Sequence, residues 1–410
     1  MKKTHLLHYS SQALLCLITF FVLACGKDPE PNPAEVADKY LVKVETIDSL
    51  SVDKVKSLVA TSNPLYGTLV SYGVKAYRIT YKTKNTDNQE IEASGAIVIP
   101  ALSANASAVP MVSYQHGTIS TEAQAPSNLN PSAGNDAQLV ILLAAQGYVA
   151  VAPDYIGYGA SKNLAHTYEH RQGLSQASLD LLRAAKEYFA KKDTRYWDKR
   201  LYLTGYSEGG YATMSLLKKI EEEAASEFNL RAVSVGSGAY NKTEFMKYIV
   251  NNQATTTESY NRLYAWVLLT YNRIYGLNRP ASYYFKEPYA SQIPPEVKHQ
   301  SDLSSLVINT SISNTFTDSF KKGLNDGTDT GFLNAVKDND VYDWKPNTTL
   351  WMYHGTADDL VPVLNSQTAF AAMKAKGAAK VQYFPVSGAN HTSAVLQYAL
   401  GTLTMIGSNP

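Results

Sequence analysis

The sequence predicts an α/β fold in which a mostly parallel central sheet is flanked by helices. From residue 109 onward, short apolar runs alternate with segments of helical periodicity. Most of these runs are continuously apolar, which is typical of strands that are buried on both faces of a parallel sheet. The 410 residues are 45% hydrophobic and only 18% charged, so the chain has the composition of a large globular core and not of a disordered protein.

Charge and cysteine content exclude several classes of function. The 37 Lys and Arg residues nearly balance the 36 Asp and Glu residues, whereas nucleic-acid binders usually carry a basic surplus. Cys16 and Cys25 are the only cysteines, and both precede the folded body. We therefore expect no nucleic-acid partner, and in the body no disulfide, thiolate metal site or cysteine nucleophile.

The N-terminal segment is typical of an export signal. Lys2 and Lys3 precede an apolar run over residues 13–24, which at 1.5 Å per residue is too short to cross a hydrocarbon layer of ~30 Å. The run ends in Val22-Leu23-Ala24-Cys25, which resembles a bacterial lipobox. The resemblance implies cleavage of residues 1–24, lipidation of Cys25, and a lipoprotein anchored at the periplasmic face or the cell surface. The alternative is ordinary secretion with Cys25 as an unused thiol.

The remaining chain divides into a tether and alternating strands and helices. Residues 25–40 contain three prolines among charges and predict a semi-extended tether. Residues 74–82 and 89–100 alternate apolar and polar side chains around Asn85-Thr86-Asp87-Asn88, which predicts a β-hairpin. Further strands are expected at 109–114, 148–152, 201–204, 232–235, 350–353 and 380–386. Helices are expected at 136–146, 175–190, 211–223, 366–376 and from residue 392 onward.

A candidate nucleophile follows the strand at 201–204. That strand runs directly into Gly205-Tyr206-Ser207-Glu208-Gly209 and then into a helix, which places a G-x-S-x-G pattern in a strand–turn–helix context. The glycines remove Cβ atoms that would collide at such a tight turn, and the helix N-terminus favours negative charge beside Ser207. A chance Gly/Ser-rich turn is the alternative, but it explains neither the preceding strand nor the following helix.

Three histidines follow Ser207, and one of them is the predicted general base. In folds with this turn the partners follow in the order Ser, Asp or Glu, then His. His299 lies in a polar segment, and His354 ends an apolar strand, where we expect it to pack or bond beneath the site. His391 lies in the loop between the last strand and the closing helix, from which an imidazole could reach Ser207.

The acid is expected after the strand at 350–353. Asp358 and Asp359 both follow this strand, and the spacing alone allows either one. The acid would hold the imidazole tautomer and stabilise the imidazolium without taking the proton itself. For either residue the alternative role is a turn or a helix N-cap.

Taken together, these motifs resemble the α/β-hydrolase superfamily, in particular its secreted lipase- and esterase-like members. The resemblance covers roughly residues 75–405 apart from one long insertion, and it implies that Asp358 is the acid. It also implies an α/β-hydrolase fold, cleavage of carboxylic esters through an acyl-enzyme, and no cofactor or metal. The motifs are Gly205-Tyr206-Ser207-Glu208-Gly209, Gly355-Thr356-Ala357-Asp358-Asp359-Leu360-Val361-Pro362 and Gly388-Ala389-Asn390-His391.

Two backbone donors are needed to hold the oxyanion of the reaction. The N–H group of Glu208, directly after the nucleophile, is one candidate. The segment Tyr114-Gln115-His116-Gly117-Thr118 resembles the oxyanion loop of the family. Within it we expect the N–H group of Thr118 to be the second donor, with Gly117 next, while His116 orients the loop.

A long insertion separates Ser207 from the predicted acid. Asp358 lies 151 residues after Ser207, but two βα units need only about 30 residues each. We therefore expect a mainly helical lid at 238–340 between core parts 41–237 and 341–410. The pentapeptide at 260–264 recurs in similar form at 271–275, so its tyrosines share one helix face and either line a substrate pocket or fix the lid to the core. The candidate pocket residues are Tyr155, Tyr206, Tyr264 and Tyr271.

Three alternative functions fit parts of the sequence. A serine peptidase of the same fold would use the same three side chains. His166-Thr167-Tyr168-Glu169-His170 matches the H-x-x-E-H pattern of zinc peptidases, which requires that the segment be helical. A lipoprotein that only binds a ligand would leave the predicted nucleophile, acid and base without a role. We predict a serine hydrolase acting on small-molecule carboxylic esters.

Overall fold

A single mixed sheet organises the chain. The computed structural model describes residues 38–192, 196–252 and 254–410, and within them nine strands form one sheet in the order β1-β2-β3-β5-β4-β6-β7-β8-β9. The first three strands and β5 pair antiparallel, and all pairs from β5 to β9 are parallel. The strands are β1 (Leu41–Leu50), β2 (Val74–Lys84), β3 (Glu90–Pro100), β4 (Val109–Gln115), β5 (Val149–Pro153), β6 (Trp197–Tyr206), β7 (Asn229–Gly236), β8 (Thr349–Gly355) and β9 (Val381–Val386).

Helices cover both faces of this sheet, because successive strand side chains point to opposite sides. On β3, Ile97 contributes to a core shared with α4 (Arg171–Lys192), α5 (Glu208–Glu223) and α11 (Leu364–Ala375). The next residue, Val98, contributes to a core on the other face. The helices of that face are α1 (Val52–Val59), α2 (Pro64–Thr68), α3 (Asn135–Ala145) and α12 (Val395–Ser408).

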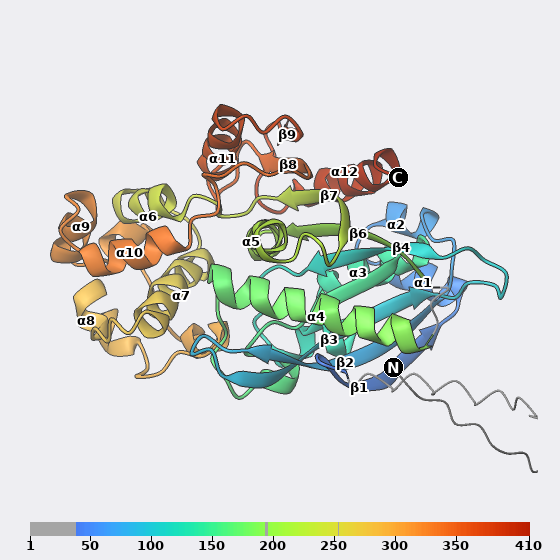
Figure 1. Cartoon of the computed structure of the whole chain (residues 1–410). Helices are drawn as coiled ribbons and strands as arrows, with labels where there is room; N and C mark the ends of the chain where they lie inside the picture. The colour runs from blue at the N-terminus through green and yellow to red at the C-terminus, as the bar shows by residue number, and fades with distance from the viewer. Residues whose placement is uncertain (1–37, 193–195, 253) are drawn as a thin grey trace, which may run out of the picture. The chain divides into compact units, whose positions relative to one another are not determined.

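The segment between β7 and β8 forms a helical subdomain with its own apolar core. Trp266, Phe320 and Phe332 are fully buried within this core. Figure 1 shows the helices of the insertion gathered together at one side of the sheet, beyond the end of β7. They are α6 (Lys242–Asn251), α7 (Glu258–Ile274), α8 (Ala281–Tyr284), α9 (Asp318–Asn325) and α10 (Thr330–Asp338).

The structure confirms the predicted α/β fold, and it adds elements that the sequence pattern did not indicate. Each predicted strand and helix is present, although α4 begins at Arg171, four residues before the predicted start. The sheet begins with β1, an edge strand whose side chains are mostly exposed or half-buried and whose pairing with β2 is interrupted by two register shifts. Because none of the β1 side chains is fully buried, its sequence lacks the apolar alternation that identifies a half-buried strand. Among the described residues, no helix has the length and apolar character needed to cross a bilayer.

Candidate active site

Ser207 occupies a strained turn between β6 and α5. Its backbone has φ 60° and ψ −126°, a conformation that is costly for a residue with a Cβ atom. The Ser207 amide donates a hydrogen bond to the Gly236 carbonyl at the end of β7 (2.9 Å), which ties the turn to the neighbouring strand. The turn therefore lifts the side chain above the carboxyl ends of the parallel strands, where ligands bind in open α/β sheets.

The glycines on both sides of Ser207 are required by close backbone contacts. A Cβ atom on Gly209 would lie 2.1 Å from the carbonyl oxygen of Gln115 in β4. A Cβ atom on Gly205 would lie 2.3 Å from the carbonyl oxygen of Gly209. Only glycine at both positions lets the first turn of α5 approach β4 and β6 this closely.

His391 connects Ser207 with Asp358. It lies in the loop between β9 and α12, and its Nε2 atom is 2.9 Å from the Ser207 hydroxyl oxygen. Its Nδ1 atom is 3.1 Å and 2.9 Å from the two carboxylate oxygens of Asp358. Because an ionised carboxylate only accepts hydrogen bonds, Nδ1 carries the proton and Nε2 is free to accept the proton of the serine hydroxyl. The structure thus brings together the three residues that were predicted from positions far apart in the sequence.

Asp358 is buried and receives donors on both carboxylate oxygens. Its side chain is 0% exposed, and Oδ1 accepts hydrogen bonds from the backbone amides of Leu360 (3.1 Å) and Val361 (2.8 Å). Burial alone would raise the pKa of Asp358, but hydrogen bonds from His354 and His391 hold that pKa well below its usual range. The neighbouring Asp359 is exposed. Of the two aspartates that the spacing allowed, Asp358 is the one in contact with His391.

His354 supports Asp358 from below. Its Nε2 atom is 2.7 Å from the carbonyl oxygen of Val361 and 3.3 Å from Oδ2 of Asp358, and its Nδ1 atom is 2.7 Å from the Ser366 hydroxyl. Since a carbonyl oxygen only accepts, Nε2 of His354 carries the proton and points it toward Val361 and Asp358. His354 is fully buried and was expected beneath the site, where the structure places it.

The chain after β4 runs beside the nucleophile. A Cβ atom added to Gly117 would lie 4.0 Å from the Ser207 Cβ atom. The Gly117 amide, however, donates to a carboxylate oxygen of Asp136 (3.3 Å), so it is not a free oxyanion donor. Among the described residues the amides of Thr118 and Glu208 donate no hydrogen bond, and the Glu208 amide opens the N-terminus of α5. These two amides therefore remain as candidate donors, whereas Gly117 does not.

The H-x-x-E-H segment does not form the geometry of a zinc peptidase. Residues 165–170 are not helical, so the two histidines do not share a helix face. His166 lies between the Ile156 carbonyl (2.7 Å from Nδ1) and the buried carboxylate of Glu208 (2.8 Å from Nε2), while His170 accepts a hydrogen bond from the Gly173 amide (3.1 Å). No group of three or more potential metal ligands occurs in the described part of the chain. His166 instead ties the side chain of Glu208, and with it the start of α5, to the loop after β5.

A small pocket of about 20 Å³, room for about one water molecule, opens beside Ser207 under the helical insertion. Its walls are largely apolar, with one pair of charged residues that the sequence analysis did not assign to a pocket. The sequence analysis assigned Glu169 only to the zinc-peptidase pattern, and no sequence motif indicated a role for Lys242. The lining residues are Tyr168, Glu169, Ser207, Lys242, Phe245, Met246, Ile249, Leu263, Tyr264, Val267, Leu360 and Val361.

Only one of the four predicted pocket tyrosines lines this cavity. Tyr264 does so, and its hydroxyl donates to the Leu360 carbonyl (2.6 Å). The rings of the other three tyrosines are packed in the interior, and their hydroxyls donate hydrogen bonds to backbone carbonyls. These bonds join Tyr155 to His116 (3.1 Å), Tyr206 to His391 (2.7 Å) and Tyr271 to Glu169 (2.8 Å). They hold the loops around the site instead of lining the cavity.

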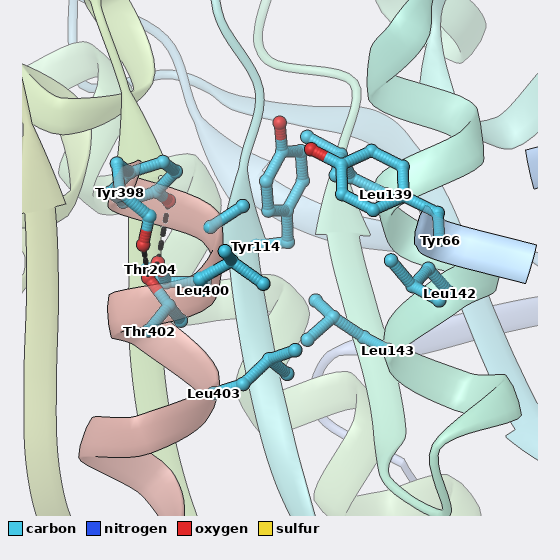
Figure 2. A pocket seen from close by; sticks show the side chains of 11 residues that line it. Tyr66, Tyr114, Leu139, Leu142, Leu143, Thr204, Tyr398, Leu400, Thr402 and Leu403 are labelled. Atoms are coloured by element: carbon cyan, nitrogen blue, oxygen red, sulfur yellow. Dashed lines mark hydrogen bonds between the residues drawn. The ribbon is translucent and has the colours of Figure 1, made fainter. Parts of the chain in front are cut away.

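A second pocket, of about 30 Å³, lies away from the site. Figure 2 shows Leu142 and Leu143 of α3 on one side of it and Leu400 and Leu403 of α12 on the other. Its lining residues include neither Ser207 nor Asp358 nor His391. It is a largely apolar gap between helices on one face of the sheet.

The sheet order, the strained serine turn and the hydrogen-bonded Ser207, His391 and Asp358 define an α/β-hydrolase. The sequence profile of the secretory lipase family matches residues 123–408, which is more than half of the chain. The chain belongs to the secretory lipase family and is a carboxylic ester hydrolase. Among curated protein sequences, none matches it.

Solved structures of similar fold include esterases and lipases. A Legionella pneumophila protein with a provisional hydrolase assignment is 26% identical, with a TM-score of 0.80 over 90% of this chain and 98% of its own. The rice cell wall degrading esterase LipA of Xanthomonas oryzae is 23% identical, with a TM-score of 0.77 over 90% and 97%. Candida antarctica lipase A in its closed state is 18% identical, with a TM-score of 0.63 over 91% and 84%.

Proposed function

We propose that the protein cleaves carboxylic esters through an acyl-enzyme formed on Ser207, with His391 as general base and Asp358 as its acid partner. The observation that carries the proposal is the hydrogen-bonded chain from Ser207 through His391 to Asp358. Its tautomer is the one that a base needs, because Nε2 of His391 accepts while Nδ1 is held by a carboxylate.

Acylation begins when the Ser207 oxygen attacks the ester carbonyl carbon. His391 takes the hydroxyl proton on Nε2, and Asp358 stabilises the resulting imidazolium. The carbonyl oxygen becomes an oxyanion, which the amides of Glu208 and Thr118 hold. Loss of one such donor typically lowers turnover by about 10²–10³-fold, so fixed backbone amides make a large contribution to the rate.

Collapse of this intermediate breaks the bond to the alcohol oxygen. His391 gives its proton to the leaving alcohol, and the acyl group remains on Ser207. A water molecule then enters on the alcohol side, loses a proton to His391, and attacks the acyl carbonyl through the same oxyanion site. When the second tetrahedral intermediate collapses, His391 returns the proton to the Ser207 oxygen, and the carboxylic acid leaves.

The helical insertion is proposed to act as a lid over Ser207. Its helices α6 and α7 supply most of the apolar wall of the cavity, and the Tyr264 hydroxyl joins α7 to the loop that carries Asp358. A cover of this kind excludes water from the reacting groups and strengthens their electrostatic interactions.

We further propose that the protein is anchored to a membrane through lipid attached to Cys25, which lies outside the described residues. Two or more acyl chains on one residue suffice for stable anchoring. Detergent phase partitioning of the full chain and of a Cys25→Ser variant tests this. We expect the wild type in the detergent phase and the variant in the aqueous phase, and equal partitioning would contradict the anchor.

The acyl-enzyme is tested with a fluorophosphonate probe and an ester substrate. We expect the probe to modify Ser207, as read by peptide mass spectrometry, and Ser207→Ala to lose both labelling and ester hydrolysis. Ser57→Ala, which alters an exposed serine on α1, is the matched control and should keep both. Labelling of another residue, or hydrolysis that survives in Ser207→Ala, would exclude the mechanism. Matched ester and amide substrates separate an esterase from a peptidase of the same fold.

A further inference from the structure

His166 and Glu208 form a buried pair next to the nucleophile, and the proposed reaction uses neither side chain. Glu208 is the first residue of α5 and directly follows Ser207, whereas His166 lies in the loop between β5 and α4. Nε2 of His166 is 2.8 Å from Oε1 of Glu208, and both side chains are 1% exposed. A buried carboxylate is costly unless a donor satisfies it, so Glu208 depends on its partner.

The hydrogen bonds of His166 require one proton more than a neutral imidazole carries. Its Nδ1 atom is 2.7 Å from the Ile156 carbonyl oxygen, which only accepts, so Nδ1 is protonated. Nε2 of a neutral ring would then present a lone pair to the Glu208 carboxylate, which also only accepts when it is ionised. The contact of 2.8 Å therefore requires a second proton between Nε2 and Oε1, whichever of the two atoms holds it.

Within the described residues, His166 makes the only hydrogen bond to the Glu208 carboxylate. The charged neighbours Lys242 and Glu169 pair with each other, and Arg273 of α7 donates to the backbone carbonyl of His166 (2.8 Å). The remaining titratable neighbours of the carboxylate are tyrosines. Burial, with a contribution from the Glu208 carboxylate, raises the pKa of each one well above its usual value, so these phenols stay neutral: Tyr155, Tyr158 and Tyr168.

The same three tyrosines connect His166 to the loop that carries the other proposed oxyanion donor, Thr118. Their ring centroids lie between 5.0 Å and 6.1 Å from that of His166. Their hydroxyls bond the carbonyl oxygens of His116 (3.1 Å) and Ile119 (2.9 Å) and the hydroxyl of Thr118 (3.3 Å). His166 therefore contacts the supports of both donors, Glu208 through a hydrogen bond and Thr118 through the packing of these rings.

The charge of the pair matters because of where Glu208 lies. Its amide is a proposed donor to the oxyanion, and its carboxylate belongs to the same residue. Without the second proton, an unneutralised carboxylate would oppose the negative charge that develops during the reaction, and such repulsion is strong in a buried site. With that proton the pair is neutral as a whole, and the first residue of α5 is fixed to the loop after β5.

We propose that His166 is a positioning residue for the oxyanion site. At neutral and mildly alkaline pH it keeps a proton between its Nε2 atom and Oε1 of Glu208, which holds the Glu208 residue in place and neutralises its carboxylate. The imidazole ring also supports the tyrosines that fix the loop of Thr118. This inference rests on the proposed acyl-enzyme mechanism and assigns a role to a histidine that the sequence analysis connected only with the zinc-peptidase pattern.

The first experiment detects the proton in the wild-type full chain by nuclear magnetic resonance. The protein is labelled with ¹⁵N-histidine and ¹³C-glutamate, and the signals of the pair are identified by their loss in His166→Phe and Glu208→Leu variants. The spectra are recorded near pH 8, where an ordinary histidine with a pKa of ~6.5 is neutral. We expect the chemical shifts of either a protonated Nε2 or a protonated Glu208 carboxyl group. An unprotonated Nε2 beside an ionised carboxylate would overturn the proposal.

The second experiment separates the charge of the pair from a simple structural tie. His166→Phe keeps an aromatic ring among the tyrosines but leaves the Glu208 carboxylate unneutralised. We expect its kcat on a short chromogenic ester to fall at least about 10²-fold with KM nearly unchanged, as on loss of an oxyanion donor. Adding Glu208→Leu removes the carboxylate, and we expect kcat to rise at least about tenfold above that of the single variant. A double variant no faster than the single one, or a single variant with nearly wild-type kcat, would overturn the proposal.

His299→Gln is the matched control. This half-buried histidine also bonds a carbonyl of the loop after β5, that of Gly157 (2.7 Å), but among the described residues its ring has no carboxylate partner. We expect kcat within about twofold of wild type. The spectra of the wild-type protein decide the proton assignment even if His166→Phe does not fold.

Failure of this inference is distinguishable from failure of the proposed mechanism. If His166 and Glu208 share no proton and the fluorophosphonate probe still labels Ser207, only the role of His166 is wrong. If Ser207 is not labelled and the Ser207→Ala variant still hydrolyses esters, the mechanism is wrong and the proposed role falls with it.

Discussion

Replacement of Asp358 by asparagine tests the base assignment most directly. The change keeps the size of the side chain but replaces one carboxylate oxygen with an NH₂ group. Because Oδ1 accepts hydrogen bonds from the amides of Leu360 and Val361, the amide oxygen of the asparagine takes that position. Its NH₂ group then faces His354 and His391 where Oδ2 was.

The tautomer of His391 decides the size of the effect. His354 keeps its proton on Nε2, since that atom also faces the Val361 carbonyl. His391 has no such constraint, so it moves its proton to Nε2 and accepts from the asparagine on Nδ1. A protonated Nε2 cannot take the proton of Ser207. We expect kcat to fall by about 10³–10⁴-fold, equivalent to about 4–5.5 kcal/mol of activation free energy, while KM changes little because Asp358 does not line the cavity.

Initial rates on a short chromogenic ester, normalised by fluorophosphonate titration of active sites, measure this loss. Asp359→Asn is the control: that side chain is exposed, and we expect a rate within about twofold of wild type. Thermal melting of both variants checks that the fold is retained. A folded Asp358→Asn enzyme with more than about a tenth of wild-type kcat, or an inactive Asp359→Asn enzyme, would refute the reasoning.

Three further predictions concern pH, packing and the position of the base. Burial lowers the pKa of His170 to about 4, whereas the pKa of a histidine in an unfolded chain is ~6.5. As the pH falls, the unfolded state therefore binds the proton first, and the folded state loses stability between about pH 6.5 and 4. His170→Asn keeps a cap for α4 but does not titrate, so urea unfolding should show that the wild type loses about 3 kcal/mol more than the variant over this range; parallel pH profiles would contradict this. Gly209→Ala places a Cβ atom 2.1 Å from the Gln115 carbonyl, and we expect little soluble protein or a melting temperature lowered by more than 10 °C, roughly the effect of 4 kcal/mol in a large domain; a normal melting curve would contradict the contact. Tyr206→Phe removes the hydrogen bond to the His391 carbonyl, and we expect kcat to fall about tenfold with KM nearly unchanged, whereas an unchanged kcat would mean that the loop is held in other ways.

The α/β sheet and its site motifs were predictable because their signals are local. Buried parallel strands give continuous apolar runs, and a serine turn against a neighbouring strand requires glycine two residues before and two residues after the nucleophile. The order of Ser207, Asp358 and His391 along the chain follows from the order of strands in the sheet. Each of these features is contained in a short stretch of sequence or in the succession of such stretches.

The choice between equivalent residues and the character of the pocket depended on the tertiary structure. The spacing alone allowed Asp358 or Asp359, and the family resemblance implied Asp358. The path of the loop after β8 is what brings the Asp358 carboxylate to His391. The sequence analysis predicted a pocket role for Tyr155, Tyr206 and Tyr271. In the structure their hydroxyls donate instead to backbone carbonyls of residues far away in the sequence. Glu169 and Lys242 are 73 residues apart, and neither lies in a pattern that indicates the other. Local periodicity determines which segments become strands and helices, whereas a contact between distant side chains exists only once the sheet and the insertion have packed.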